Sequence, residues 1–375
     1  MAHKAERGVF ELRQGRVLCV TDADQGPLAL VAAVEGLDPE SLDQLRSLGE
    51  PIRLIVTTHR GNAMGIRAHE GGGDLSLLLA ASETPETILG LATDRLSARS
   101  GPYPGLGARP ATRAESAGLT ITRLAGLLPA LVAAEADPRS PLLQRWLEDG
   151  TILDASTEEV ERAASGAGIE ITSVAEAPVP LAVDEHARFV FFREGGGLLE
   201  HVAVLIGPRE SWPDPVPVRL HSACLTGDLF GSMRCDCGEQ LRGSLEHFGR
   251  RGGGVLVYLA QEGRGIGLGN KMRAYTLQES GLDTVDADGV LGFGADERRY
   301  DAAVAILRHL EIERVELLTN NPHKVAAVED GGLVVSARTP IYGGINRHNL
   351  RYVQAKLDRS GHWLMDMISQ RASAD

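Results

Sequence analysis

The sequence is poor in cysteine, in aromatic residues and in long apolar runs. It has four cysteines in 375 residues, and residues 1–6 contain no apolar run that could serve as a signal peptide. A disulfide framework is therefore not expected, the thiols should stay reduced, and the expected location is the cytoplasm. No apolar stretch is long enough for a membrane span. Aromatic residues make up 4% of the chain, too few for platforms that stack single-stranded nucleic acid.

The charge is negative and unevenly distributed. The net charge is −13. Residues 1–200 contain 18 Lys and Arg against 29 Asp and Glu, a balance of −11, whereas residues 201–375 contain 20 against 22, a balance of −2. A nucleic-acid surface needs clustered cations, so no nucleic-acid partner is expected. The nearly neutral second half has room for a local cationic pocket that binds a small anion.

Three of the four cysteines lie close together in the second half. Cys224 is followed by ten residues and then by Cys235 and Cys237, with one residue between them. Three thiolates can hold one zinc ion and leave a fourth position for water, the arrangement of a catalytic zinc site. The same spacing fits a structural zinc completed by His221, or reduced core thiols. Cys19 lies inside an apolar run and is expected to be a core residue.

A glycine-rich loop at residues 261–271 follows a predicted strand and precedes a predicted helix at residues 270–279. Backbone N–H groups of such a loop can approach phosphates. Its glycines are Gly263, Gly265, Gly267 and Gly269, a spacing that matches neither the dinucleotide-binding fingerprint nor the P-loop. A structural turn therefore explains the loop as well as a phosphate site does.

Length and pattern predict an α+β protein of two mixed α/β domains. A short proline-bearing segment near residues 172–182 marks the expected boundary, which gives domains at residues 1–171 and 172–375. Apolar runs predict strands at residues 16–22, 52–57, 187–192, 201–206, 253–260 and 315–319.

Several helices are expected from apolar residues at helical spacing. One is predicted over residues 75–93, and another over residues 117–135, where Pro129 marks a break or a new first turn. Residues 283–289 are expected to form a polar connection. Asp301 should cap the helix that follows it.

Residues 172–375 resemble GTP cyclohydrolase II, the enzyme that opens guanine in riboflavin biosynthesis. The resemblance runs through four blocks in order, residues 219–237, 261–275, 292–298 and 317–325. It favours a catalytic zinc over the two other interpretations of the cysteines. It implies that Cys224, Cys235 and Cys237 hold zinc, that water activated there attacks carbon 8 of the guanine ring, and that a second hydrolysis releases formate.

The resemblance also implies loss of pyrophosphate, with magnesium accompanying the triphosphate. Arg298 matches the proposed nucleophile toward the α-phosphate and Asp296 its proton acceptor, while Tyr275 matches a tyrosine near the ring-opening centre. Because the pKa of arginine is far above neutral, positioning and charge stabilisation is an alternative role for Arg298. Further positions match contacts to GTP: Arg219, Leu220, His221, Ser222, Ala223, Gln240, Glu262, Gly263, Arg264, Thr284, Thr319 and Lys324.

Among these contacts, Arg219, Arg264 and Lys324 are expected to reach phosphates. Glu262 suits the amino and ring N–H groups of guanine, because a carboxylate only accepts hydrogen bonds. Ala223 departs from the family, in which many members have glutamate at that position. An altered affinity or rate is expected, and loss of activity is the alternative.

Residues 117–135 resemble the segment that follows the Gly-His-Thr-Glu-Ala motif of 3,4-dihydroxy-2-butanone 4-phosphate synthase. Of that motif Glu115 remains, and the histidine is absent. The acidic loop with which that family binds magnesium corresponds to residues 24–29, Asp-Gln-Gly-Pro-Leu-Ala, which lack most of the oxygen ligands that magnesium needs. The resemblance implies the synthase fold for residues 1–171, without its activity.

Three functional hypotheses follow. The first is a zinc GTP cyclohydrolase II that uses GTP and acts as a homodimer, with a first domain that serves packing, oligomerisation or regulation. The second is a bifunctional enzyme that also converts ribulose 5-phosphate to 3,4-dihydroxy-2-butanone 4-phosphate. The third is a non-catalytic GTP-binding or zinc-structural partner of another riboflavin enzyme. None of the three requires a membrane partner.

Overall fold

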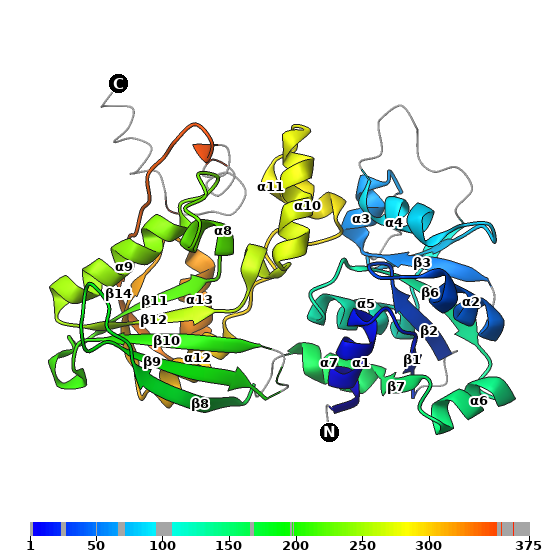
Figure 1. The fold of residues 1–375 in the computed structure, drawn as a ribbon, viewed down its shortest axis with the longest axis horizontal. Coiled ribbons are helices and arrows are strands. Elements are labelled where there is room, and N and C mark those ends of the chain that lie inside the picture. Colours follow the sequence, from blue (N-terminus) through cyan, green and yellow to red (C-terminus); the bar gives the residue numbers. More distant parts are fainter. Residues whose placement is uncertain are drawn as a thin grey trace. The chain divides into compact units, whose positions relative to one another are not determined.

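The computed structural model describes residues 3–23, 28–49, 51–66, 72–94, 107–165, 169–195, 197, 199–350, 354 and 363. The chain forms two compact units (Figure 1). The first consists of Met1–Ala167 and Gly269–Glu297, and the second of Gly168–Leu268 and Arg298–Asp375. Residues 24–27, part of the loop compared with the acidic loop of the synthase, lie outside the described residues.

A seven-stranded sheet forms the centre of the first unit. Its order is β5-β4-β3-β6-β2-β1-β7; β1 and β7 pair in parallel, and the other neighbours are antiparallel. The strands are β1 (Leu18–Thr21), β2 (Leu28–Ala33), β3 (Ile52–Val56), β4 (Leu75–Leu78), β5 (Ala108–Pro110), β6 (Ala130–Ala136) and β7 (Leu153–Ser156). The helices are α1 (His3–Arg13), α2 (Pro39–Leu48), α3 (Thr58–Ala63), α4 (Pro85–Thr93), α5 (Arg113–Leu124), α6 (Pro141–Glu148), α7 (Thr157–Ser165), α10 (Leu268–Glu279) and α11 (Thr284–Val290).

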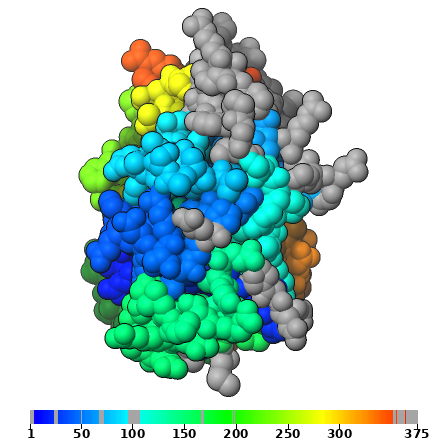
Figure 2. Space-filling view, turned by 90° about the vertical axis from the view of Figure 1, so that its right-hand side faces the viewer, coloured from blue at the N-terminus to red at the C-terminus, as the bar shows by residue number. Residues whose placement is uncertain are grey.

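Helices pack on both faces of this sheet because successive strand residues point to opposite sides. Leu30 of β2 belongs to a core cluster with Leu45 of α2. On the other face, α5 approaches closely, since a Cβ at Gly118 would lie 2.9 Å from Leu131 and 3.2 Å from Val31. The face turned to the viewer in Figure 2 shows an early, blue part of the chain beside a later, green part.

Two helix predictions in this unit, over residues 75–93 and 117–135, are partly wrong. Residues 75–78 form β4, which pairs with β3 and β5, and the helix begins at Pro85. Residues 130–136 form β6, because the helix before it ends at Leu124 and the chain after Pro129 pairs with β2 and β3. β6 is a central strand with apolar residues on both faces, so its sequence lacks the alternation by which a strand is recognised.

Two expectations about residues 283–301 are also corrected. The polar connection at residues 283–289 contains α11, whose N-cap Asp283 accepts a hydrogen bond from the N–H of Asp286 at 2.8 Å. Asp301 does not cap α12 (Asp301–His309): it is the first helical residue, and the N-cap position is Tyr300.

The second unit contains a mixed seven-stranded sheet in the order β14-β13-β11-β12-β10-β9-β8. Its strands are β8 (Ile171–Pro178), β9 (Arg188–Glu194), β10 (Glu200–Ile206), β11 (Val216–Ser222), β12 (Gly254–Leu259), β13 (Arg314–Leu318) and β14 (Val334–Thr339). Its helices are η1 (Arg209–Ser211), α8 (Leu225–Asp228), α9 (Cys237–Arg251), η2 (Glu262–Gly265), α12 and α13 (Pro322–Asp330). The two mixed sheets confirm the predicted fold class.

Opposite faces of the second sheet meet different helices. Val257 packs in a core cluster with Ile306 of α12 and Val328 of α13, whereas its neighbour Leu256 packs with Phe248 of α9. The sheet is therefore a rigid middle layer on which the surrounding loops are held. In the part of the chain that the structure describes, no helix is long and apolar enough to cross a membrane.

Candidate functional site

The candidate site lies at the edge of the second sheet that is formed by the carboxyl ends of its parallel strands. β11 is parallel to both β12 and β13, so the three strands end at the same edge. β11 leads into Cys224, β12 into the loop 261–271, and β13 into Thr319 and Lys324. Ligand sites form at such an edge because loops from several strands meet there.

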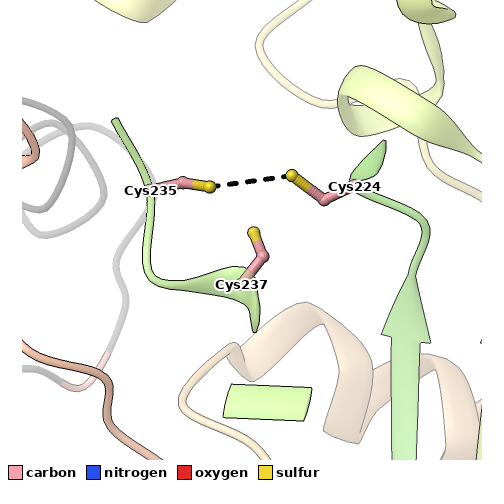
Figure 3. A group of neighbouring side chains, drawn as sticks. All are labelled: Cys224, Cys235 and Cys237. Carbon is pink, nitrogen blue, oxygen red and sulfur yellow. Dashed lines mark hydrogen bonds between the residues drawn. The ribbon is translucent and has the colours of Figure 1, made fainter. Parts of the chain in front are cut away.

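The three clustered cysteines meet at this edge (Figure 3). The thiol sulfurs of Cys224, Cys235 and Cys237 lie within 4.8 Å of one another, and they form the group of possible metal ligands found among the described residues. The sulfurs of Cys224 and Cys235 are 3.6 Å apart. That distance is too long for a disulfide, and close to the roughly 3.8 Å that separates two sulfurs bound at about 2.3 Å to one tetrahedral zinc.

Gly227 makes room for the three sulfurs. A Cβ at this position would lie 2.7 Å from the sulfur of Cys235 and 3.1 Å from that of Cys224. Gly227 lies in the single turn of α8, which begins directly after Cys224. The short helix and its glycine therefore form a cradle for the thiols, and the donor set fits a thiophilic dication such as zinc.

Hydrogen bonds and burial favour the protonated form of Cys235 and Cys237. A hydrogen bond with Cys224 raises the pKa of Cys235 to about 11. Hydrogen bonds with Cys224 and Cys235, followed by burial, raise the pKa of Cys237 well above its usual value. A bound dication would reverse this preference, because it stabilises the thiolate form.

Asp228 supports the thiol cluster and is not among the predicted site residues. Its carboxylate accepts hydrogen bonds from the backbone N–H of Cys224 at 3.0 Å and from the hydroxyl of Tyr258 at 2.9 Å. Nε2 of His221 lies 3.1 Å from both carboxylate oxygens. The spacing Cys224-x-x-x-Asp228 was the available signal, because in a helical turn it places the carboxylate beneath the cysteine.

His221 is held as a partner of Asp228 and is not part of the thiol cluster. Burial lowers the pKa of its imidazole, an effect that the hydrogen bond to Asp228 opposes. The neutral ring donates from Nε2, since a carboxylate only accepts, and Nδ1 then has a lone pair for which the structure shows no hydrogen-bond partner. The ring also stacks on Tyr258, with centroids 5.6 Å apart.

Arg219 is a buried cation beside the thiols. Its guanidinium donates to the carbonyl of Leu318 at 2.8 Å and to Oε1 of Gln240 at 2.7 Å, and Nε has no hydrogen-bond partner among the residues that the structure describes. Gln240 in turn donates to Asp236 at 2.5 Å. Burial lowers the pKa of Arg219, while the nearby Asp236 and Cys237 raise it. The charge of Arg298 is close enough to lower that pKa further.

Lys324 and Thr319 come from the loop and helix that follow β13. The ammonium group of Lys324 is buried; it donates to the carbonyl of Leu220 at 2.7 Å and lies 5.7 Å from the ring centroid of Tyr300. The hydroxyl of Thr319 accepts from the N–H of Asn321 at 3.0 Å. Two buried cations at one sheet edge form a setting in which a phosphate can be bound.

Two neighbours of Cys224 tie β11 to the loop after β12. The hydroxyl of Ser222 accepts from Nε2 of Gln261 at 3.3 Å, and the N–H of Ala223 donates to the carbonyl of Leu259 at 2.8 Å. Residues 222 and 223 are therefore joined to the end of β12 and to the loop that follows it.

The glycine-rich loop contains a left-handed turn. Gly263 has φ 62° and Arg264 has φ 63°. Such a conformation is strained for arginine, and strain of this kind is characteristic of functional sites. Glu262 accepts from the N–H of Leu225, at the start of α8, at 2.6 Å, and so links this turn to the cysteine segment. Of the two explanations for the loop 261–271, a phosphate site and a structural turn, the strained arginine favours a functional role.

Three predicted residues belong to the first unit. Tyr275 is in α10, and its ring centroid lies 5.7 Å from the ammonium group of Lys271. Thr284 is the first residue of α11. Asp296 directly precedes Glu297, which accepts from the N–H of Gly294 at 2.7 Å. The structure thus gathers the other predicted residues, including Arg298, in the second unit and these three in the first.

Glu115, the residue left from the synthase motif, has a structural role. It is buried, both of its oxygens lie 2.8 Å from the guanidinium of Arg109, and it also accepts from the N–H of Thr112 at 2.7 Å. Thr112 and Glu115 form a capping box at the start of α5. Both oxygens of the Glu115 carboxylate therefore accept hydrogen bonds that stabilise the fold.

Solved structures similar to the chain are 3,4-dihydroxy-2-butanone 4-phosphate synthases. One is RibBX, a two-domain synthase from A. baumannii, with 16% identity, a TM-score of 0.34, and coverage of 91% of this chain and 100% of that one. Another, from Candida albicans, has 16% identity and a TM-score of 0.35, with coverage of 42% of this chain and 95% of that one. TM-scores this low do not establish a shared fold.

Curated relatives match almost the whole chain. A GTP cyclohydrolase-2 of Xylella fastidiosa (strain 9a5c) is 40% identical over 98% of this chain and 90% of its own length. One of Azospirillum brasilense is 39% identical over 95% and 93%, and a riboflavin biosynthesis protein RibBA of Phocaeicola vulgatus is 37% identical over 95% and 87%. The family model for GTP cyclohydrolase II matches residues 172–340. With the thiol cluster and buried cations in the matched region, this chain belongs to the GTP cyclohydrolase II family of riboflavin biosynthesis.

Proposed function

We propose that this chain is a zinc-dependent GTP cyclohydrolase II. It hydrolyses GTP to 2,5-diamino-6-hydroxy-4-(5-phosphoribosylamino)pyrimidine, formate and pyrophosphate. The observation that supports this most strongly is the cluster of three thiols around Gly227, with the cation of Arg219 close enough to Cys237 to affect the pKa of Arg219. A thiophilic metal and a polyanion can be bound side by side at such an edge.

The cations bind the triphosphate. Arg219 and Lys324 are already held by protein carbonyls, which reduces the entropy that phosphate binding would cost. Gln240 holds the guanidinium of Arg219 in position. Arg264, in the left-handed turn, is the third cation that we assign to the triphosphate, and magnesium accompanies the leaving pyrophosphate.

The remaining residues orient guanine and move protons. Cys224, Cys235 and Cys237 would hold zinc, which when bound lowers the pKa of a coordinated water to near neutral. Glu262 accepts from guanine N–H groups, since a carboxylate only accepts hydrogen bonds and those guanine groups only donate. Tyr275 donates or relays a proton at the ring. Asp296 and Arg298 act at the α-phosphate.

The domain assignment is part of the proposal. Residues 172–375 supply the metal ligands and most nucleotide contacts, and residues 1–171 have no synthase activity of their own. Because the segment Gly269–Glu297 packs in the first unit, the compact units and these proposed domains differ there. We place the enzyme in the cytoplasm, as its few, reduced cysteines lead us to expect, and as a homodimer, as the family resemblance implies.

The test uses the full chain with GTP and magnesium. Formate and pyrophosphate should both appear, and mass spectrometry should identify the pyrimidine product. Removing zinc and the variant Cys235→Ser should each stop formate release, whereas Cys19→Ala should retain it, because Cys19 lies in the core of the first unit. Formate release that continues after complete zinc removal contradicts the metal assignment.

Two other outcomes contradict the proposal in distinct ways. Tight GTP binding without turnover under any metal condition would support the non-catalytic hypothesis. A product that is hydrolysed at carbon 8 but retains formate or pyrophosphate would show that Ala223, or another departure from the family, has changed the reaction.

A further inference from the structure

The segment Gly269–Glu297 is part of the first unit, although its sequence lies between two parts of the second. It includes Tyr275, Thr284 and Asp296, to which the proposed function assigns catalysis and GTP contact. The proposed function gives the rest of the first unit no role. The contacts between this segment and residues 1–167 therefore bear on what those residues do.

A buried arginine holds the middle of the segment. Arg60 of α3 is 1% exposed, and its guanidinium donates to the carbonyl of Val290, the last residue of α11, at 2.9 Å. The same guanidinium donates to Leu91 at 2.8 and 3.1 Å and to Asp94 at 3.0 Å, where α4 ends. A cation between two helix C-termini is favourable, because the carbonyl groups there carry partial negative charge.

A second contact next to Arg60 brings the two backbones close together. The hydroxyl of Thr57 donates to the carbonyl of Gly292 at 2.6 Å. Gly292 has φ 89°, and a Cβ there would lie 3.0 Å from Pro129 and 3.2 Å from the Thr57 hydroxyl. The positive φ favours glycine, and the space for a Cβ is tight, which indicates an interface adapted to this contact.

The start and the end of the segment are held by ion pairs. Glu35 accepts from the guanidinium of Arg273 at 3.0 Å and, through its other oxygen, from the N–H of Leu128 at 2.9 Å. At the far end Arg123 of α5 pairs with Glu297, whose other oxygen caps the turn at Gly294. Arg273 is two residues before Tyr275, and Glu297 is adjacent to Asp296.

We propose that residues 1–167 act as a positioning platform for the segment Gly269–Glu297, with Glu35, Thr57, Arg60 and Arg123 as positioning residues that act through the backbone of that segment. The inference rests on the proposed function for its catalytic consequence. Reaction rates depend steeply on geometry, and a displacement of about 1 Å can lower a rate by about 100-fold. A domain without chemistry of its own thus becomes necessary for the rate.

Arg123→Met is the most informative variant because both partners in its ion pair are partly exposed. The matched control is Arg113→Met: both arginines are on α5, both form ion pairs, and their side chains are 46% and 39% exposed. Arg113 pairs with Asp22, Glu158 and Glu161, none of them in the segment. Comparing the two variants separates the effect of losing any surface ion pair from the effect of losing an anchor, which here means a contact that holds the segment Gly269–Glu297.

In the full chain, Arg123→Met should lower kcat for formate release by about tenfold or more, with zinc content unchanged and KM for GTP within about twofold. Arg113→Met should match the wild type, and Arg123→Lys should restore most of the rate, since lysine can still pair with Glu297. Equal kcat for the wild type, Arg123→Met and Glu35→Gln overturns the platform. A loss in Arg123→Met that Arg113→Met reproduces also overturns it.

Hydrogen–deuterium exchange separates this inference from the proposed function. Arg123→Met should speed amide exchange near residues 293–298, and Glu35→Gln should do so near residues 270–276, with the thiol segment unchanged. If the wild type releases no formate, the proposed function fails, but the exchange result still decides whether the anchors exist. Unchanged exchange in both variants overturns the platform whatever the activity.

Discussion

The carboxylate of Asp228 accepts a hydrogen bond from the backbone N–H of Cys224 at 3.0 Å. The same carboxylate binds the hydroxyl of Tyr258 and the ring of His221. We predict that Asp228→Asn lowers zinc affinity or the rate of formate release by about 10- to 100-fold, because groups that orient metal ligands have effects of this size. Zinc competition with a chromophoric chelator and a formate assay would measure both.

The control for this variant is Asp214→Asn. Asp214 is 70% exposed and pairs with Arg314 at the surface of the same unit, so its loss should change neither zinc affinity nor rate. Equal zinc affinity and rate for Asp228→Asn and the wild type would contradict the supporting role of Asp228.

Gly227→Ala should abolish metal binding. The added Cβ would lie 2.7 Å from the sulfur of Cys235, closer than such atoms approach, so the thiols would have to separate. Gly243→Ala, in α9 of the same unit, is the matched control, because its Cβ would come no nearer than 3.4 Å to Ile341. Metal analysis of both purified variants, with circular dichroism to confirm folding, tests this. Full zinc content in Gly227→Ala would show that the cradle is not required.

Zinc affinity should rise with pH. The pKa of Cys235 is raised to about 11, and that of Cys237 is also raised, so both thiols are protonated at neutral pH without metal. Zinc must displace those protons; lowering the pH therefore weakens binding, and two released protons correspond to about 100-fold per pH unit. Competition titrations at pH 6.5 and 7.5, with proton release measured in weak buffer, would check the slope. A pH-independent affinity would exclude thiolate ligation.

Arg264→Gly should have opposite effects on stability and on GTP binding. Glycine adopts the left-handed conformation at φ 63° without strain, so the free energy of unfolding should increase by about 0.5–1 kcal/mol. Loss of the guanidinium should raise KM for GTP by about tenfold or more. Urea unfolding and steady-state kinetics measure the two effects.

Glu311→Gly is the control for that pair of effects. Glu311 has φ 55° and forms an exposed ion pair with Arg209, so glycine there should bring a similar gain in stability and leave KM unchanged. A rise in KM in both variants would show that the loop effect is not specific to Arg264.

Ribulose 5-phosphate should not be converted to 3,4-dihydroxy-2-butanone 4-phosphate. Glu115 is engaged by Arg109 and by the cap of α5, and residues 24–29 lack most of the oxygen ligands that magnesium needs. Incubation of the full chain with ribulose 5-phosphate and magnesium, followed by mass spectrometry, checks this. Appearance of the butanone phosphate would establish a bifunctional enzyme.

The thiol cluster could be predicted because it depends on local sequence. The spacing of Cys224, Cys235 and Cys237 limits how far their side chains can separate, and the structure brings their sulfurs together. The buried strands β12 and β13 were likewise predicted from short apolar runs, at residues 253–260 and 315–319. By contrast, the four-residue spacing from Cys224 only hints at Asp228, because its role also depends on a hydroxyl from a neighbouring strand, that of Tyr258.

Residues 75–78 and 130–136 show where local pattern fails. Their apolar residues suit a helix as well as a strand, and pairing with neighbouring strands decides between the two. β6 lies between β3 and β2, whose sequences are distant from it in the chain. A short stretch of sequence therefore does not show which strands will pair with it.

The sequence by itself determined the chemistry that this protein can perform: three thiols, a set of cations and a glycine-rich turn, in an order that identifies a family. The tertiary structure decided how those groups are supported. It placed Asp228 under Cys224 and grouped the segment Gly269–Glu297 with the first unit. The physical reason is that the sequence gives the type of each side chain directly. Hydrogen bonds such as that from Arg60 to Val290 join residues that meet only after the chain has folded.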